Sequence, residues 1–122
     1  MNSMQYVNLL GVHPGCVELR PFAKKFFDAL GVNDREERES SNYIDGYYFK
    51  GSLGGMTFSV AISDEDAHEN VPYWIHISAD LVTPDALEDA VFQLIRDKVL
   101  PMGFQLVRIV NFGKRGELRI DY

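Results

Sequence analysis

The residue types best suited to chemistry are gathered in two short segments, residues 13–16 and 63–70. The first segment, His-Pro-Gly-Cys, holds the only cysteine of the chain close to an imidazole. A cysteine nucleophile needs a base and a residue that orients this base, and these groups usually come from distant parts of a fold. Because His13 and Cys16 share one turn with no orienting Asn or Asp beside them, we interpret Cys16 as a buried or merely tolerated thiol.

The second segment, Ser-Asp-Glu-Asp-Ala-His-Glu-Asn, combines carboxylates with an imidazole, and such a set of groups can bind a divalent cation. It lacks the glycine and the ligand spacing of an EF-hand, and the sequence contains no HExxH motif. We therefore expect no metal ion or other cofactor here. The segment is typical of a solvated hairpin loop.

The remaining candidate motifs give no better support for catalysis. Residues 50–55, Lys-Gly-Ser-Leu-Gly-Gly, do not match the phosphate-binding pattern and lie between two expected strands, so they predict a turn. No GxSxG motif is present. His76 lies in an expected strand, where a half-exposed packing role is more common than that of a base. The sequence thus predicts a protein that is not an enzyme.

Length and composition are those of one ordinary globular domain, which we expect to span residues 1–122. The chain has 122 residues, 46% of them hydrophobic, and at this length it can bury a core without disulfides. A single cysteine excludes an intramolecular disulfide and favours a reducing compartment, so we expect a cytoplasmic protein. No apolar stretch is long enough for a membrane span, and residues 1–10 do not resemble a signal peptide.

Charge is distributed unevenly along the chain. Residues 34–69 contain nine acids and three bases, which accounts for the whole net charge of −6. An acidic chain with a pI near 4.9 is unlike a nucleic-acid binder, whose affinity depends on clustered Lys and Arg. A basic protein partner fits this charge better. The acidic segments are then either a solvated surface or a patch that faces such a partner.

Helical spacing and end signals predict two helices. Apolar residues recur at helical spacing over residues 20–30, with Pro21 in the first turn and Gly31 just after the end. Thr83 and Pro84 begin a second helix, which Pro101 and Gly103 end. The charged residues 34–41 between the first helix and the next expected strand are predicted to form a loop.

Aromatic and alternating patterns predict the strands. Residues 43–50, 56–63 and 73–79 are expected to form an antiparallel meander, and residues 104–112 and 117–122 a further pair. Residues 4–10 give a weaker strand signal, because their pattern is mixed. The expected fold is α+β, a two-layer sandwich with a mainly antiparallel sheet of about five strands and two helices packed on one face.

One face of this sheet is a candidate binding surface. If both helices cover the face that carries Phe58 and Ile77, the other face displays small and polar residues around one tryptophan: Thr57, Ser59, Ala61, Trp74, His76 and Ser78. This face is either a partner surface or simply solvated. A register slip of one residue would exchange the two faces and bury Trp74 in the core instead.

The overall pattern resembles the small acidic immunity proteins of bacterial toxin–immunity systems, including those of contact-dependent growth inhibition. The features that carry the resemblance are the compact α+β layout, the acidic segments at residues 34–39 and 63–69, the aromatic strand at residues 43–49, and the reducing compartment. The resemblance implies tight, non-catalytic binding of one cognate toxin. A nuclease-type toxin would be basic, so acidic residues could compete for its phosphate-binding surface and speed association.

On this hypothesis the partner-binding residues are mostly acidic, with aromatic anchors beside them: Asp64, Glu65, Asp66, Glu69, Glu36, Glu37, Tyr47, Trp74 and His76. The expected partner is a basic protein toxin, with no nucleic acid and no membrane involved, and the oligomeric state is left open. The alternative is a small-molecule or regulatory binding domain, monomeric or dimeric. It would use the exposed sheet face or a pocket between helix and sheet.

Overall fold

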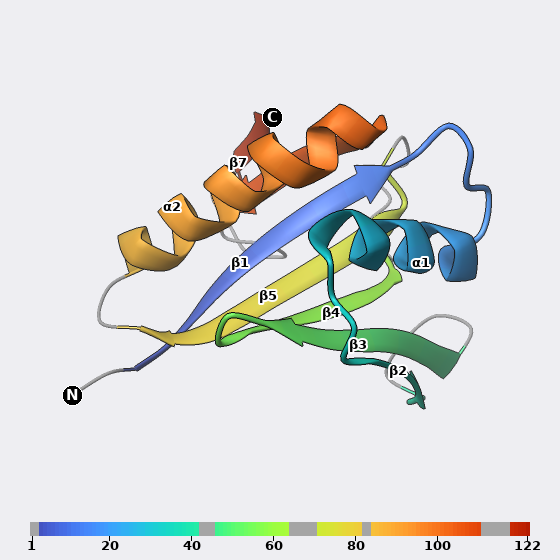
Figure 1. Cartoon of the computed structure of the whole chain (residues 1–122), viewed down its shortest axis with the longest axis horizontal. Helices are drawn as coiled ribbons and strands as arrows, with labels where there is room; N and C mark the ends of the chain where they lie inside the picture. Colours follow the sequence, from blue (N-terminus) through green and yellow to red (C-terminus); the bar gives the residue numbers. More distant parts are fainter. Residues whose placement is uncertain (1–2, 42–45, 64–70, 82–83, 111–117) are drawn as a thin grey trace.

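A computed structural model of the chain describes residues 3–41, 46–63, 71–81, 84–110 and 118–122. It has an α+β fold with a seven-stranded antiparallel sheet and two helices, both on the near side of the sheet in Figure 1. The strands are β1 (Ser3–Val12), β2 (Arg35–Glu39), β3 (Tyr47–Leu53), β4 (Met56–Ile62), β5 (Tyr73–Leu81), β6 (Gln105–Val110) and β7 (Leu118–Asp121). None of the helices in these ranges has the length and apolar character needed to span a bilayer.

The order of strands in the sheet is β2-β3-β4-β5-β1-β6-β7, and every neighbouring pair is antiparallel. The predicted meander β3-β4-β5 is confirmed. The first strand of the chain, β1, lies between β5 and β6 and pairs with both of them. Its close approach to β6 depends on Gly11, because a Cβ there would collide with the side chain of Leu106.

The sheet has seven strands where the sequence predicted about five, and one of the additional strands overturns a loop prediction. Residues 34–41 were expected to be a loop, but β2 pairs with β3 from Arg35↔Gly51 to Glu39↔Tyr47. The segment has no apolar alternation because β2 is an exposed edge strand, where charged residues are tolerated and discourage pairing with other chains.

The turn between β3 and β4 is shorter than predicted. Residues 50–55 were expected to form it, yet β3 continues to Leu53 and pairs Leu53 with Met56. Only Gly54 and Gly55 make the turn, with φ of 57° and 82°. Two central residues with positive φ make a type I′ turn, which suits the twist of the flanking strands. The prediction of glycine with positive φ at this turn is confirmed, whereas residues 43–45 of the expected strand lie outside the described residues.

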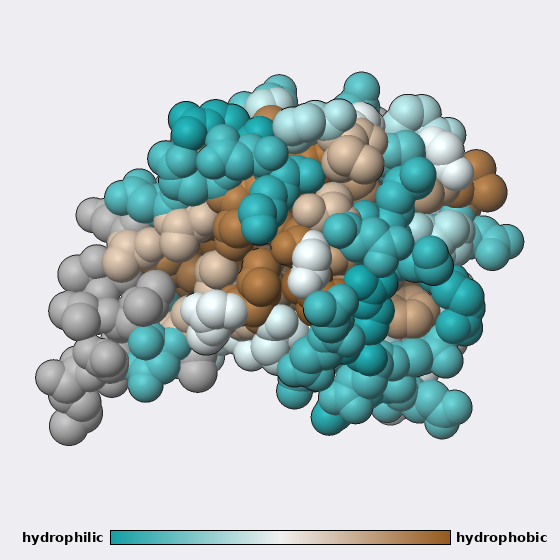
Figure 2. Space-filling view, in the orientation of Figure 1, coloured by the Kyte–Doolittle hydropathy of each residue, from teal (hydrophilic) through white to brown (hydrophobic). Residues whose placement is uncertain are grey.

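Both predicted helices are present. Helix α1 (Leu19–Leu30) buries Phe22, Phe26 and Leu30 and ends at Gly31, as its spacing predicted. Helix α2 (Pro84–Leu94) continues as a π-helical turn (Ile95–Val99) and a 3₁₀ turn (Leu100–Met102), and the helical segment ends at Gly103. Figure 2 shows hydrophilic side chains over α1 and β2 and an apolar area between the two helices.

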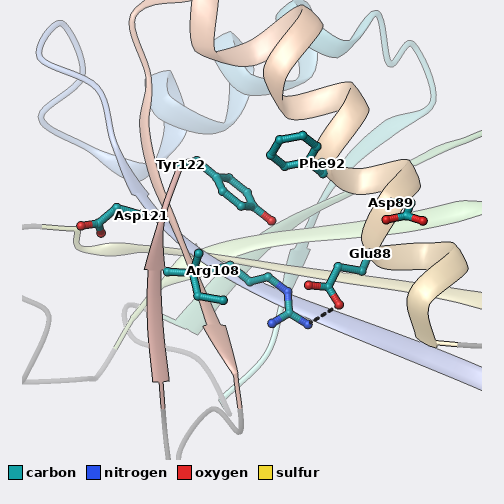
Figure 3. A pocket seen from close by; sticks show the side chains of 7 residues that line it. Glu88, Asp89, Phe92, Arg108, Asp121 and Tyr122 are labelled. Atoms are coloured by element: carbon teal, nitrogen blue, oxygen red, sulfur yellow. Dashed lines mark ion pairs between the residues drawn. The ribbon is translucent and has the colours of Figure 1, made fainter.

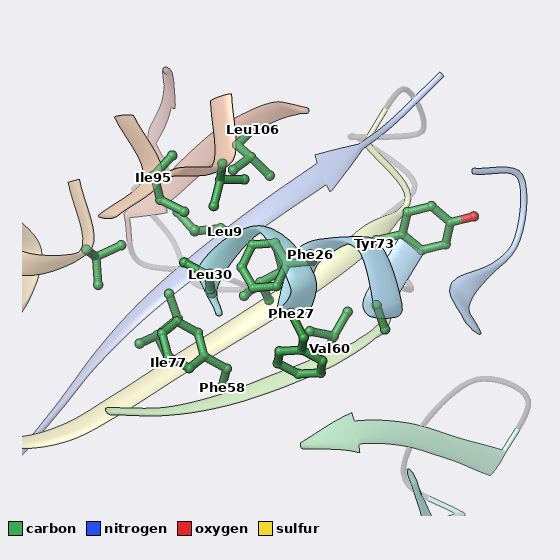
Figure 4. Packing of buried hydrophobic residues seen from close by; sticks show 14 of the residues in the cluster. Leu9, Phe26, Phe27, Leu30, Phe58, Val60, Tyr73, Ile77, Ile95 and Leu106 are labelled. Atoms are coloured by element: carbon green, nitrogen blue, oxygen red, sulfur yellow. The ribbon is translucent and has the colours of Figure 1, made fainter. Parts of the chain in front are cut away.

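The main core lies between the helices and the near face of the sheet. Figure 4 shows Phe26 and Leu30 of α1 packed among residues of four strands and of the segment after α2, including Leu9, Phe58, Ile77, Ile95 and Leu106. In β4 the buried residues Met56, Phe58 and Val60 alternate with less buried ones. Since alternate side chains point to opposite faces, the far face carries the other set.

Candidate functional site

The face of the sheet without helices, here called the open face, carries the polar set that the sequence predicted. Its central residues come from three adjacent strands: Tyr6 and Asn8 of β1, Thr57, Ser59 and Ala61 of β4, and Trp74, His76 and Ser78 of β5. The register places His76 between Asn8 and Ser59. Trp74 is half-buried on this face and does not belong to the main core, so the alternative register is excluded.

Four of these residues, Tyr6, Asn8, Trp74 and His76, form what we call the Asn8 cluster. The indole Nε1 of Trp74 donates a hydrogen bond of 3.0 Å to Asn8 Oδ1, and His76 Nδ1 lies 2.8 Å from the same oxygen. The ring of Tyr6 stacks on that of His76 at 5.3 Å, and Trp74 meets His76 edge-on at 5.8 Å. One amide oxygen therefore organises three aromatic rings from two strands.

This geometry determines the tautomer of His76. The indole N–H of Trp74 is only a donor, so the Asn8 atom that faces it must be the acceptor Oδ1. The same Oδ1 lies 2.8 Å from His76 Nδ1, so Nδ1 must carry the proton. In neutral His76 the lone pair is then on Nε2, which makes no hydrogen bond within the described part of the chain.

Burial lowers the pKa of His76 below its ordinary value of 6.5. The imidazole loses contacts with water, which stabilise its charged form, and this loss of solvation lowers the pKa. His76 is therefore neutral near pH 7. Its Nε2 is a hydrogen-bond acceptor suited to an N–H or O–H donor of a binding partner.

A second apolar cluster supports the Asn8 cluster from one side. It consists of Leu10, Val71, Val107 and Ile109, all buried, with Val12 and Trp74 packed against them. Trp74 therefore contacts apolar side chains with its ring while its N–H is held by Asn8. Packing and hydrogen bonding together fix the rings before any partner binds, which reduces the entropy cost of binding.

Among the sequence-predicted site residues that the structure describes, Trp74 and His76 lie together on the open face. Glu37 and Tyr47 lie elsewhere and both contact Arg20 of α1. Glu36 is an edge residue paired with Arg38 at 2.8 Å, whereas Glu37 pairs with Arg20 of α1. Tyr47 is half-buried against the main core, on the side of the helices. The predicted residues Asp64, Glu65, Asp66 and Glu69 lie outside the described residues.

Sequence reasoning missed Tyr6 and Asn8. Both have even numbers in β1 and so share one face, which the pattern of residues 4–10 could have shown. Their neighbours could not be read from the sequence, because β1 pairs with β5, a strand almost seventy residues later in the chain. The contact of Asn8 with Trp74 depends on that pairing.

The two ends of the His13–Cys16 turn have structural contacts. The N–H of Gly15 donates to His13 Nδ1 at 3.0 Å, and His13 Nε2 lies 2.9 Å from the carbonyl oxygen of Met102. Since a carbonyl only accepts, Nε2 carries the proton and ties this turn to the end of the helical segment. Cys16 is buried, as expected. Within the described ranges no group of three or more His, Cys, Asp or Glu residues is placed to hold a metal ion.

A pocket of about 630 Å³ lies on the other side of the sheet, between α2 and strands β6 and β7. Figure 3 shows Arg108 of β6, Glu88 and Phe92 of α2, and Tyr122 around it. Arg108 Nη2 is 3.5 Å from Glu88 Oε2. A pocket between helix and sheet is one of the two sites that the small-molecule alternative offered, the other being the exposed sheet face.

Comparison of the chain with protein-family models, with curated proteins and with solved structures finds no significant match. The function is therefore inferred from the chemistry of the open face and of the pocket.

Proposed function

We propose that this chain is a non-catalytic binding protein of the immunity type, which neutralises a basic protein toxin by docking it on the open face. The observation that carries the proposal is the Asn8 cluster. Its rings are fixed in place, and Tyr6 is 57% exposed although it is a large aromatic residue. Aromatic side chains on a rigid surface are the residues that most often dominate the binding energy of protein interfaces.

The electrostatics support a basic partner. Neutral His76 offers an acceptor at Nε2, which matches the N–H donors of Lys and Arg. The net charge of −6 attracts a basic protein over a longer range and raises its association rate. Some charges at the two edges of the sheet pair with each other, as Glu36 does with Arg38 and Arg119 with Asp121. On this proposal the centre of the interface is aromatic, and the long-range electrostatic attraction comes from the net charge of the whole molecule.

The test of this proposal is affinity capture of the tagged full chain from extracts of its source organism, at about 50 and about 200 mM salt. We expect one stoichiometric basic protein, with lower recovery at the higher salt because screening weakens charge attraction. Mass spectrometry identifies it, and its toxicity with and without this chain completes the test. Recovery of no protein under conditions that express neighbouring genes, or of an acidic protein, would contradict the proposal.

The pocket beside α2 favours a second function, the binding of a small molecule. Its volume of about 630 Å³ is within the range of about 300–1,000 Å³ that small-ligand sites have. A partner on the open face and a ligand in this pocket would bind to opposite sides of the sheet. The two functions can therefore be tested separately.

A further inference from the structure

The lining of the α2 pocket combines one largely buried cation with three acidic residues and three apolar or aromatic ones. Arg108 comes from β6, Phe92 from α2, and Ile120 from β7, with Tyr122 just after it. Asp121 also contributes to the lining, but its side chain points away from the pocket in Figure 3 and pairs with Arg119 at 2.9 Å. The pocket therefore presents a guanidinium beside rings and an aliphatic side chain, with Glu88 and the exposed Asp89 on its α2 side.

The hydrogen bonding of Arg108 is incomplete. Its side chain is only 14% exposed, and its separation of 3.5 Å from Glu88 is longer than the usual 2.7–2.9 Å of a charge-assisted hydrogen bond. Its Nε atom is buried and has no hydrogen-bond partner in the described structure. A buried guanidinium is costly unless its donors are satisfied. Because Nε itself is buried, a ligand in the pocket could supply an acceptor only to the terminal Nη groups of Arg108.

Tyr122 is a second donor at the same place. Burial raises the pKa of its hydroxyl above the ordinary value of 10.0, and the nearby carboxylate of Glu88 adds to the increase against the opposing effect of Arg108. The hydroxyl is therefore protonated at neutral pH and can donate a hydrogen bond. In Figure 3 it points into the pocket, toward the region where Glu88 and Arg108 meet.

We infer that the α2 pocket is a binding site for a small carboxylic acid with a flat apolar body. Two carboxylate oxygens match the planar donor fork of Arg108, and the hydroxyl of Tyr122 provides a third donor. The apolar body would lie against Phe92 and Tyr122, whose rings meet edge-on at 5.7 Å. Glu88 is 40% exposed and held at 3.5 Å, so its carboxylate can turn to solvent when the ligand takes its place. This inference rests on the second function proposed above, small-molecule binding, and does not depend on the proposal of toxin binding.

Phenylacetate and benzylamine are a matched pair of probes for this site, since they share a ring and differ in the sign of their charge. Each is titrated into the full chain while backbone amide shifts are followed by NMR. We expect phenylacetate to cause saturable shifts at α2, β6 and β7, with little change on the open face. Benzylamine should cause none. Equal binding of benzylamine would overturn the inference, and so would the absence of a saturable shift with phenylacetate up to about 10 mM, which is enough to detect a Kd of about 1 mM.

Two substitutions test the donors. Arg108→Lys keeps the charge and removes the planar fork, and Tyr122→Phe removes only a hydroxyl. We expect the Kd for phenylacetate to rise about tenfold or more in the first variant and by a smaller factor in the second. Unchanged Kd values in folded variants would overturn the assignment of these donors. If Arg108→Lys does not fold, Tyr122→Phe and the wild-type preference for phenylacetate over benzylamine decide the matter.

Discussion

Asn8 is the residue on which the arrangement of the open face depends. Its single oxygen accepts from Trp74 and His76, so a side chain without this oxygen would remove the acceptor of these two part-buried donors. An unpaired buried donor costs about 1–3 kcal/mol. Asn8 thus positions the rings. A partner on the open face would contact Tyr6, Trp74 and His76.

Titration of the histidine rings by ¹⁵N NMR tests this arrangement. We expect the proton of neutral His76 on Nδ1, because Nδ1 faces Asn8 Oδ1, and a pKa below 6.5, because burial disfavours the charged ring. His13 is an internal control for the tautomer, since its contacts place the proton on Nε2. In the variant Asn8→Ala the His76 preference for Nδ1–H should disappear. A wild-type His76 protonated on Nε2 would contradict the geometry.

Because the pKa of His76 is lower in the folded chain, this residue makes stability decrease at acidic pH. The unfolded chain, with a pKa near 6.5, binds the proton more readily than the folded one. The contribution of His76 to the free energy of unfolding is therefore retained above pH 6.5 and lost as the pH falls through 6.5 toward the folded pKa. Urea unfolding at a series of pH values measures this loss of stability, which should follow the NMR titration of His76. The His76 contribution should be absent from the variant His76→Gln.

The β3–β4 hairpin, which lies next to the edge strand β2, turns at two glycines, Gly54 and Gly55. Both have positive φ, and such a backbone is strained for residues with a Cβ. We expect Gly55→Ala to lower the free energy of unfolding by about 1–2 kcal/mol. Gly54→Asn should lower it less, because Asn tolerates this conformation. Urea unfolding measures both changes. A Gly55→Ala variant with the same free energy of unfolding as the wild type would argue against a type I′ turn.

The same elements show what sequence patterns can and cannot predict. Both helices were found because apolar spacing and end signals act locally, as with Pro21 and Gly31. Strand β4 was found because its alternation is strict. Strand β2 was missed because an exposed edge strand needs no apolar face, and its charges pair with other elements, as Arg35 does with Asp28. Only tertiary structure provides those partners.

At the scale of the whole molecule, two layers give two independent surfaces. The helices cover one face of the sheet and leave the open face. Alternation predicted which residues share a face with Trp74, but the register that places them on the open face came from the structure. The α2 pocket was not predictable residue by residue, because Glu88, Arg108 and Tyr122 come together only through the packing of α2 on β6 and β7. The strand order that brings Asn8 to Trp74 was equally beyond sequence patterns.

If the partner binds on the open face, its affinity must fall when an exposed ring of that face is removed, and the captured partner can be measured against two variants. Tyr6→Ala removes an aromatic ring that is 57% exposed on this face, and Met102→Ala is a matched control that is 56% exposed at the end of the helical segment. Calorimetry gives the Kd, and circular dichroism verifies folding. We predict that Tyr6→Ala raises the Kd about tenfold or more, whereas Met102→Ala leaves it nearly unchanged. A folded Tyr6→Ala variant that binds as tightly as the wild type would contradict the account.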